Sequence, residues 1–417
     1  MDKFVITGGK KLAGDVKISG AKNAILPIMT AALLAKGKSI FHNVPHLNDI
    51  KMMAHVLRVL GARVEYENET LSIDTTHADY YEAPYELVSK MRASIYVLGP
   101  LLARCGKARV SFPGGCAIGT RPVDLHLKVM EALGATIDIE HGYINAACEH
   151  LEGAKIRFEK VSVGATANAV MAAVLADGIT NLHNVAKEPE IGSLINCLVL
   201  MGAKIEGKDT NHIQITGVKE LQPIETEMIP DRIEAGTFLI AGAITGSRIS
   251  ISNCIPEHIQ SLLDRLIQAG CKLNIGKMKV EIIPPSEILP VNIVTYPYPD
   301  FPTDLQAQFM ALMTLAKGES RIEDTIFPDR LMHVAELNRL DADISLEKHV
   351  AVVNGVNSLS GAMVMATDLR ASAALVLAGL AAMGETTISR IYHIDRGYDK
   401  IEVKLQKLGA EIKRIKG

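Results

Sequence analysis

The sequence lacks any apolar run of about eighteen residues without a charge or a glycine, so it predicts no transmembrane helix. Its N-terminus, MDKFVITGG, also lacks the apolar stretch of a signal peptide, and we expect a cytoplasmic protein. Basic residues are not in excess, because 44 Lys and Arg stand against 47 Asp and Glu, a formal charge of −3. This balance argues against a membrane or a nucleic acid as partner, and any anion site must be a local cluster of cations.

The motifs of metal and phosphate-loop chemistry are also missing. The six cysteines are scattered without a CxxC pair, which argues against a disulfide framework or a zinc site, and we interpret five of them as small buried hydrophobic residues. No GxxxxGK[ST] sequence occurs, and no GxGxxG follows a strand. The thirteen histidines form no HExxH motif and no metal-spaced cluster, so we predict no metal.

One pattern recurs six times along the chain. Each repeat has an alanine-rich helical stretch, a glycine, a β-branched run, an amphipathic stretch that ends near LGA, and a short alternating strand. A glycine suits a helix C-terminus because it adopts the left-handed conformation without strain. Repeat five has Asp341-Ala342 in place of the second Gly-Ala. In repeats one to six, the glycines that close the first helix are Gly37, Gly106, Gly178, Gly246, Gly318 and Gly384.

The repeats predict an α/β fold with the helices inside. The first helix of each repeat is apolar almost all round, as in MTAALLA and ALVLAGLAA, so we expect it to be buried on all sides, with the sheets outside. Six units of about 70 residues exceed a single core. We therefore expect two groups of three repeats, divided near LQPIETEMIPDRIE.

Repeat two is longer than the others. From the first-helix glycine to the LGA glycine it spans 28 residues, Gly106 to Gly134, against 24 in repeat one, Gly37 to Gly61. The extra residues fall in PGGCAIGTRP, residues 113–122. Because the other repeats fold without them, we interpret this segment as a functional loop that its glycines make mobile. Cys116 is then an exposed thiol on a lid.

Polar residues break the apolar pattern near the starts of the first helices. Asp and Ser at such positions fit N-caps, but the cations Lys22, Arg92 and Arg370 oppose the helix dipole there. Several cations at corresponding positions indicate a substrate with two or three negative charges. His126 and His393 lie beside these positions and fit a structural role equally well. The candidate residues are Lys22, Asn23, Arg92, Arg121, Lys160, Ser162, Gly164, Asp304, Asp368, Arg370 and Arg396.

These residues together resemble the enolpyruvyl transferase family over the whole chain. The motifs that carry the resemblance are ISGAKNA, MRASI, PGGCAIGTRPVDLH, VSVGAT, PDRIEAGTF, FPTDLQAQ, MATDLRAS and YHIDRGY. The resemblance implies a two-lobed inside-out α/β barrel of six βαβαββ repeats, three per lobe. It also implies that residues 22–229 form the lobe that binds a nucleotide sugar, and that residues 1–21 and 230–417 form the catalytic lobe.

The activity implied by the resemblance moves the enolpyruvyl group of phosphoenolpyruvate to the 3-hydroxyl of UDP-N-acetylglucosamine and releases phosphate. This reaction is the first committed step of bacterial peptidoglycan synthesis. It proceeds by addition and elimination through a tetrahedral ketal, and it needs no metal or organic cofactor. We expect a monomer or a weak homo-oligomer.

The resemblance also implies the role of each site residue. Cys116 is the general acid, which can bond covalently to phosphoenolpyruvate and is alkylated by fosfomycin in the family. Asp304 accepts the proton of the sugar hydroxyl. Lys22, Arg121 and Arg396 bind phosphate and carboxylate, and Asp368 and Arg370 belong to a further site motif. The nucleotide-sugar contacts are Asn23, Arg92, Arg121, Pro122, Val123, Asp124, Leu125, Lys160, Val161, Ser162, Val163, Gly164 and Ile326, with Asp304.

Two other functions compete with this interpretation. The enolpyruvyl transferase of the shikimate pathway shares the fold and the donor but uses another acceptor, and PGGCAIG and RPVDLH disfavour it. A nucleic-acid clamp is also built from repeated βα units, but it needs a basic inner face, which the charge balance and the apolar helices disfavour.

Overall fold

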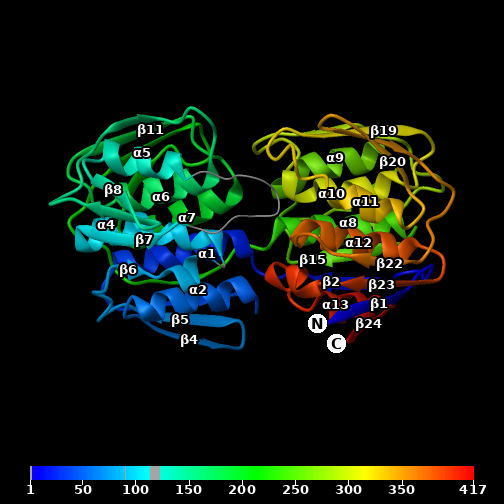
Figure 1. Cartoon of the computed structure of the whole chain (residues 1–417), viewed down its shortest axis with the longest axis horizontal. Coiled ribbons are helices and arrows are strands. Elements are labelled where there is room, and N and C mark those ends of the chain that lie inside the picture. The colour runs from blue at the N-terminus through cyan, green and yellow to red at the C-terminus, as the bar shows by residue number, and fades with distance from the viewer. Residues whose placement is uncertain (1, 90, 113–122) are drawn as a thin grey trace. The chain divides into compact units, whose positions relative to one another are not determined.

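The computed structural model describes residues 2–89, 91–112 and 123–417, and these divide into two compact units (Figure 1). We name the unit of residues 20–112 and 123–229 the first lobe, and the unit of residues 2–19 and 230–417 the second lobe. In the described residues, the chain passes between the lobes at 19–20 and at 229–230. The two crossing segments are paired, because Ala21 N–H donates to Ile229 O at 2.7 Å and Asp231 N–H donates to Ser19 O at 2.8 Å.

The first lobe has three four-stranded sheets, one per repeat. In each sheet a short edge strand from the end of one repeat lies parallel to the first strand of another, and the remaining strands are antiparallel. The strand orders are β14 (Glu225–Glu227), β3 (Lys38–His42), β5 (Thr70–Asp74), β4 (Arg63–Glu67); β6 (Glu82–Ala83), β7 (Lys107–Ser111), β9 (Tyr143–Ala147), β8 (Thr136–Glu140); and β10 (Lys155–Arg157), β11 (Ile179–His183), β13 (His212–Thr216), β12 (Lys204–Glu206).

The second lobe repeats this design. Its N-terminal segment completes repeat six, because β1 pairs antiparallel with both β23 and β24. The strand orders are β2 (Gly14–Lys17), β15 (Ile249–Ser252), β17 (Lys279–Ile283), β16 (Lys272–Ile275); β18 (Ile293–Thr295), β19 (Glu319–Asp324), β21 (Val350–Asn354), β20 (Asp343–Glu347); and β22 (Met363–Met365), β23 (Glu385–Ser389), β1 (Lys3–Thr7), β24 (Glu411–Ile415).

The first helices of the repeats are interior, as their apolar composition predicts. In the second lobe nearly every residue of these helices is buried, and the sheets lie outside them (Figure 1). This arrangement confirms the predicted α/β fold of helices inside and sheets outside. The first helices are α1 (Lys22–Ala31) with η1 (Ala32–Leu34), η2 (Arg92–Val97) with α4 (Leu98–Cys105), α6 (Val163–Ala173), α8 (Arg232–Ile244), α10 (Thr303–Met313) and α12 (Leu369–Ala381).

The second helices α2 (Asn48–Val59) and α9 (Gln260–Gln268) are amphipathic, and each contacts both the first helix and a strand of its own repeat. Repeat two departs from the expected single first helix, since it opens with the 3-10 segment η2 before α4 begins. The remaining helices are α2 (Asn48–Val59), α3 (Tyr85–Val88), α5 (Asp124–Ala132), α7 (Pro189–Leu200), η3 (Pro256–Ile259) with α9 (Gln260–Gln268), α11 (His333–Asn338), and η4 (Ile391–Arg396) with α13 (Ile401–Lys407).

The repeat glycines have positive φ, but only one of them caps its helix as the sequence predicts. Gly106 is the left-handed C-cap of α4, and Gly246 directly follows the C-cap of α8. The other four lie two or four residues beyond the C-cap, in the turn that leads to the next strand. The φ values of the six run from 58° at Gly246 to 147° at Gly318. Asp341 takes the place of the LGA glycine in repeat five and also has positive φ, 65°. Aspartate is one of the few residues other than glycine that tolerates this region, so the exception in the sequence leaves the turn intact.

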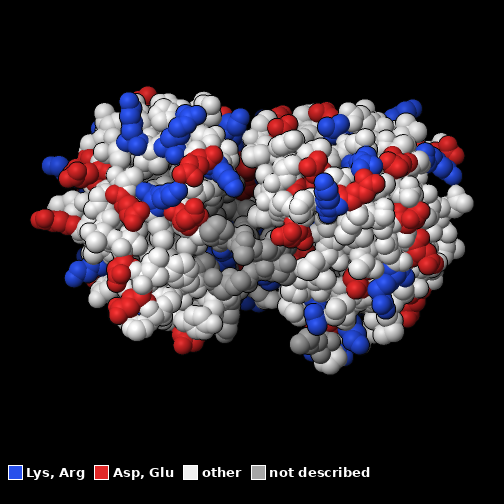
Figure 2. All heavy atoms as spheres, turned by 45° about the horizontal axis from the view of Figure 1, so that its top comes forward, with Lys and Arg blue, Asp and Glu red and all other residues white. Residues whose placement is uncertain are grey.

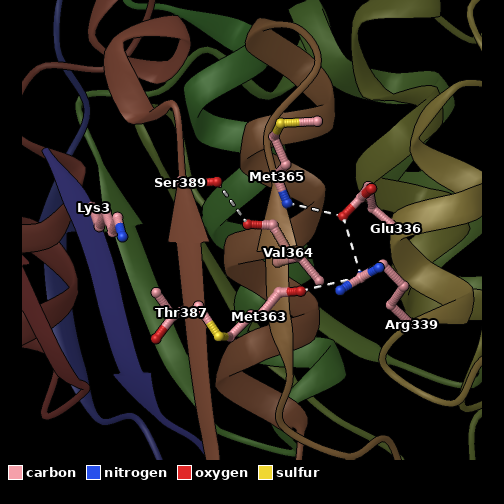
Figure 3. Close-up of a pocket in the computed structure, with 8 residues that line it drawn as sticks. All are labelled: Lys3, Glu336, Arg339, Met363, Val364, Met365, Thr387 and Ser389. Atoms are coloured by element: carbon pink, nitrogen blue, oxygen red, sulfur yellow. Dashed lines mark hydrogen bonds and ion pairs between the residues drawn. The ribbon is translucent and has the colours of Figure 1, made fainter. Parts of the chain in front are cut away.

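The edge strand β22 is protected by side chains of α11. Glu336 Oε2 accepts the Met365 N–H at 2.8 Å, and Arg339 Nε donates to Met363 O at 3.1 Å (Figure 3). Exposed edge strands pair readily with other chains, and here two side chains occupy the backbone groups. A pocket of about 300 Å³ lies beside them, and it contains none of the predicted site residues. Its other lining residues are Lys3, Val364, Thr387 and Ser389.

Candidate active site

Three predicted site residues, Cys116, Arg121 and Pro122, lie outside the described residues, together with the rest of the segment 113–122. The others are described, and they fall into one group in each lobe.

Lys22 is the first residue of α1, where its charge opposes the helix dipole. The structure supplies a counter-charge, because Lys22 Nζ lies 2.7 Å from Asp49 Oδ2 and both side chains are almost buried. Asp49 itself lies in the first turn of α2, where a carboxylate stabilises the helix. This pair fixes the Lys22 ammonium group at the start of the interior helix, next to Asn23.

The starts of α5 and α6 lie side by side around His126. The His126 ring packs against Gly164, where a Cβ atom would lie 3.1 Å from Cε1 and Nε2. Ser162 caps α6, and its Oγ accepts the Ala165 N–H at 3.3 Å. The predicted contacts Val123 to Leu125 and Ser162 to Gly164 therefore come together at these two helix starts. Lys160 and Val161 precede the cap, and Arg92 begins η2, which contacts both α1 and α6.

Asn168 fixes the protonation of His126. Its Oδ1 accepts the Gly99 N–H at 3.0 Å, and its Nδ2 donates to Ile95 O at 2.9 Å and to His126 Nδ1 at 2.8 Å. The ring proton is therefore on Nε2, on the side of Gly164. Burial, with a smaller contribution from the charge of Arg92, lowers the pKa of His126 to about 3. The imidazole is neutral at physiological pH.

The lowered pKa of His126 predicts a loss of stability in acid. Because the folded-state pKa of about 3 lies below the unfolded value, only the unfolded chain takes up this proton between pH 6.5 and 3. The neutral His126 makes its full contribution to the free energy of unfolding above pH 6.5, and this contribution falls by about 2 kcal/mol by pH 5. His126→Asn keeps an acceptor for Asn168 and should remove this share of the pH dependence. Urea unfolding at pH 8 and pH 5 measures it, and an unchanged pH dependence in the variant would contradict the assignment.

In the second lobe, Asp304 is held between two arginines. It lies in the first turn of α10, where Oδ1 accepts from Arg330 Nη1 at 2.9 Å and Oδ2 accepts from Arg370 Nη2 at 3.0 Å. Both guanidinium groups are almost completely buried, with 6% and 3% of their side chains exposed. Asp368 caps α12 by accepting the N–H groups of Arg370 and Ala371 at 2.8 and 3.2 Å.

The electrostatics of this group follow from burial and from the arginines. Burial by itself would raise the pKa of Asp304, but Arg370 and Arg330 outweigh it and hold the pKa well below its usual range. Burial lowers the pKa of His333, at the start of α11, to about 4, against the opposing effect of Asp368. The Nε atoms of both arginines are buried and have no hydrogen-bond partner within the described residues.

Side chains behind Asp304 fix its position. Gln308 Nε2 donates to the Asp304 backbone carbonyl at 2.9 Å and to Tyr398 Oη at 3.2 Å. The Tyr398 hydroxyl also lies 2.8 Å from Thr237 Oγ1, and the Tyr398 ring centroid is 5.6 Å from Arg370 Cζ. These contacts link α8, α10 and α12 near their starts, and α10 and α12 carry Asp304 and Arg370.

Arg396 belongs to the same region of the second lobe. It is the last residue of η4, and its charge helps lower the pKa of His393, which burial lowers most. Asp368 acts on His393 in the opposite direction. Arg396 and Asp368 are therefore both close enough to the half-buried His393 to affect its charge. Ile326 lies in the loop after β19, and its N–H donates to Asp324 Oδ1 at 3.0 Å.

Sequence reasoning missed three functional candidates. Arg330, Asp49 and Asp324 lie outside the first-helix starts that drew attention, and each contacts a predicted site residue or its neighbour. For Arg330 a signal was present, because FPDR repeats the PDR of the motif PDRIEAGTF. Asp49 and Asp324 gave no such signal, since each is a single acidic residue next to a strand or helix end.

The five described cysteines are free thiols, of which Cys197, Cys254 and Cys271 are buried. Burial raises the pKa of each of these three to about 12. Cys105 and Cys148 are only partly buried, contrary to the expectation of five buried cysteines, and burial raises their pKa values as well. Thiols of this kind are poor nucleophiles near neutral pH.

Two structural features are absent from the described residues. No group of three or more His, Cys, Asp and Glu side chains there is arranged to hold a metal ion. No helix in the same residues combines the length and the apolar composition needed to span a membrane. On the face drawn in Figure 2, Lys and Arg are interspersed with Asp and Glu rather than gathered into the basic surface that a nucleic-acid clamp needs.

Comparison with known proteins identifies the family. The family model described as EPSP synthase (3-phosphoshikimate 1-carboxyvinyltransferase) matches residues 6–405. A UDP-N-acetylglucosamine 1-carboxyvinyltransferase of Geobacter metallireducens is 56% identical over 416 residues, covering 100% of both chains. One of Chloroherpeton thalassium is 54% identical over 417 residues, covering 99% of this chain and 97% of the relative.

Solved structures agree with the fold. The enolpyruvyl transferase NikO from Streptomyces tendae superposes with a TM-score of 0.90 at 26% identity, covering 100% of this chain and 99% of that one. EPSP synthase from Acinetobacter baumannii gives a TM-score of 0.77 at 17% identity, covering all of both chains, which shows a shared fold. Because the family model matches residues 6–405, which is almost the whole chain, the chain belongs to the EPSP synthase family of enolpyruvyl (carboxyvinyl) transferases.

Proposed function

We propose that this protein transfers the enolpyruvyl group of phosphoenolpyruvate to the 3-hydroxyl of UDP-N-acetylglucosamine and releases phosphate. The observation that carries the proposal is the full-length identity of 51–56% to relatives named for this transfer. The site supports it, because the donor is an anion with a carboxylate and a phosphate, and both lobes carry buried cations at helix starts. The reaction supplies a precursor of bacterial peptidoglycan.

The donor requires several cations to hold and polarise it. We assign Lys22, Arg121 and Arg396 to its phosphate and carboxylate. Arg330 and Arg370 add two buried guanidinium groups to the second lobe, and their positive charge favours an anionic ligand beside Asp304. Asp368, which caps α12, fixes the backbone on which Arg370 lies.

The addition step needs an acid and a base. The Cys116 thiol gives its proton to the methylene carbon of phosphoenolpyruvate, and the sugar 3-oxygen bonds to C2 of the donor. The hydroxyl proton passes to Asp304, and a tetrahedral ketal results. In the elimination, the Cys116 thiolate takes a proton back from the new methyl group, phosphate leaves with the proton held by Asp304, and the enol double bond is restored. No electron is gained or lost overall, so the chemistry requires no redox cofactor.

The surroundings of Asp304 constrain this step. A carboxylate whose pKa is held well below its usual range by Arg370 and Arg330 is a weak base. Proton transfer to Asp304 therefore requires that a guanidinium group turns from this carboxylate toward the donor.

The acceptor contacts lie mainly in the first lobe. We assign residues 22–229 to the nucleotide sugar and residues 1–21 and 230–417 to catalysis. The helix starts around His126, with Arg92 and the segment Lys160 to Gly164, provide N–H groups and positive charge for a diphosphate. We also assign Asn23 of the first lobe and Ile326 of the second lobe to the contacts with the nucleotide sugar. We further propose that the protein acts in the cytoplasm, as a monomer or a weak homo-oligomer.

A phosphate-release assay tests the proposal. Phosphoenolpyruvate should yield phosphate with UDP-N-acetylglucosamine as acceptor, and the rate should fall to background without it. The comparison acceptor is 3-phosphoshikimate, which should support no turnover. Turnover with 3-phosphoshikimate in place of UDP-N-acetylglucosamine would refute the proposed acceptor while leaving the family assignment intact.

A further inference from the structure

A structural role for asparagine recurs at one position of the repeat. In repeats one, three and four, an asparagine with a φ of 53–57° follows the first strand after the interior helix. Its side-chain amide donates to a carbonyl group just beyond the parallel edge strand, which closes the end of the sheet. These bonds are Asn43 to Met228 O at 3.0 Å, Asn184 to Phe158 O at 2.9 Å, and Asn253 to Ile18 O at 2.8 Å.

Repeat five has an acid at this position. Asp324 follows Gly318 by six residues, as Asn43 follows Gly37 and Asn184 follows Gly178. Its backbone differs from that of the asparagines, because Asp324 is the last residue of β19 and does not have a positive φ. An ionised carboxylate has no hydrogen to donate, so it cannot make the bond that closes the other sheets. Asp324 is completely buried, and no lysine or arginine of the described residues forms an ion pair with it. Burying such a charge is costly unless hydrogen bonds compensate for it.

Four donors compensate the charge of Asp324. Its Oδ1 accepts the Ile326 N–H at 3.0 Å, the Phe327 N–H at 2.9 Å and the Thr295 hydroxyl at 2.8 Å. Its Oδ2 accepts the Thr303 hydroxyl at 2.6 Å. Asp324 therefore joins the ends of two strands to the following loop and to the first residue of α10.

The segments that Asp324 joins carry the catalytic groups. Thr303 immediately precedes Asp304 in α10. The loop after β19 carries Ile326 and leads to Arg330, whose Nη1 donates to Thr303 Oγ1 at 3.2 Å and to Asp304 Oδ1 at 2.9 Å. One buried carboxylate thus sets the position of the proposed base, of an arginine that holds it, and of a proposed acceptor contact.

We propose that Asp324 is a positioning residue, which fixes the loop of Ile326 and the start of α10 relative to each other for transfer. Its effect on turnover rests on the proposed function. The other repeats argue that the fold does not require an acid here, because three of them close the sheet with asparagine. The acid in repeat five therefore serves the site rather than the architecture.

Asp324→Asn tests the proposal, because it installs the residue that three other repeats use. Hydrogen bonds to a neutral acceptor are about half as strong as those to a carboxylate, and the new amide group faces the Thr303 hydroxyl. We expect a folded protein in which peptides covering residues 325–330 exchange their amide hydrogens about tenfold faster. We also expect kcat/KM for UDP-N-acetylglucosamine to fall about ten- to hundredfold, through both a lower kcat and a higher KM.

Thr303→Val tests the connection of Asp324 to α10 separately from its connection to the loop of Ile326. It removes the bond from α10 to Asp324, together with the bond from Arg330 Nη1 to Thr303 Oγ1, but leaves the three bonds to Oδ1. The kcat should therefore fall while the exchange of residues 325–330 stays normal. The matched control is Asn253→Asp, the mirror change in repeat four. It should lower stability, because a carboxylate would face the Ile18 carbonyl, yet leave the kinetic parameters of the folded enzyme unchanged.

Normal kinetics and normal exchange in Asp324→Asn would overturn the proposal. If this variant fails to fold, Thr303→Val decides alone, and a wild-type kcat in that variant counts against the proposal. If the wild-type protein shows no enolpyruvyl transfer, the proposed function fails. The exchange measurement then still decides whether Asp324 orders the loop.

Discussion

Asp304→Asn should lower kcat for phosphate release by about a hundredfold or more, since a positioned base contributes about 10²–10⁴ in rate. The amide cannot take up the sugar hydroxyl proton. The substitution also leaves Arg330 and Arg370 with a neutral partner, so we expect the free energy of unfolding to fall by about 3 kcal/mol. Steady-state kinetics at saturating substrate concentrations, with urea unfolding in parallel, measure both effects.

Gln308→Ala is the matched control for the base. It removes the side chain that supports the Asp304 backbone carbonyl but leaves the carboxylate and both arginines in place. Its kcat should fall much less than that of Asp304→Asn, at a comparable cost in stability. A kcat for Asp304→Asn within threefold of wild type would exclude Asp304 as the base.

Cys116→Ser should lower kcat near neutral pH by about 10²–10⁴, because a hydroxyl group is a far weaker acid than a thiol with a reference pKa of about 8.5. Cys116→Asp should retain activity, since a carboxylic acid also donates a proton. Both variants should resist alkylation by fosfomycin, which mass spectrometry of the intact protein detects.

The other cysteines provide the control for Cys116. Cys148→Ser should keep the wild-type kcat and the wild-type labelling, because burial raises the pKa of that thiol and so makes it unreactive. Labelling at Cys105 or Cys148 in the wild-type protein, with none at Cys116, would disprove the assignment of the acid.

The fold could be predicted from the sequence because its repeats impose a regular physical pattern. Interior helices need apolar residues on all sides, and ALVLAGLAA shows this directly. Turns with positive φ favour glycine, and one of the six spaced glycines follows the first helix of every repeat, while Asp341 replaces the second glycine of repeat five. The resemblance added the placement of the N-terminal segment, which periodicity could not give, because β1 pairs with strands almost the whole chain away.

The site was only partly accessible to sequence reasoning. Cations at helix starts stand out because they oppose the dipole, and so Lys22 and Arg370 were found. Asp49, which pairs with Lys22, and Arg330, which pairs with Asp304, were not found. They are common residues in ordinary positions, and only the folding of each repeat brings them within 3 Å of the start of its first helix. Asp324 became visible only when its bonds were compared with those of the asparagines in other repeats.

The identity of the product tests the central claim most directly. Phosphoenolpyruvate labelled with ¹³C at C2 should be incubated with UDP-N-acetylglucosamine and the protein, and the nucleotide-sugar fraction examined by NMR. We predict an enol ether in which the labelled carbon couples to the proton on C3 of the sugar, together with one equivalent of released phosphate. A label found at another oxygen, or no label in the nucleotide sugar while phosphate is released, would contradict the account.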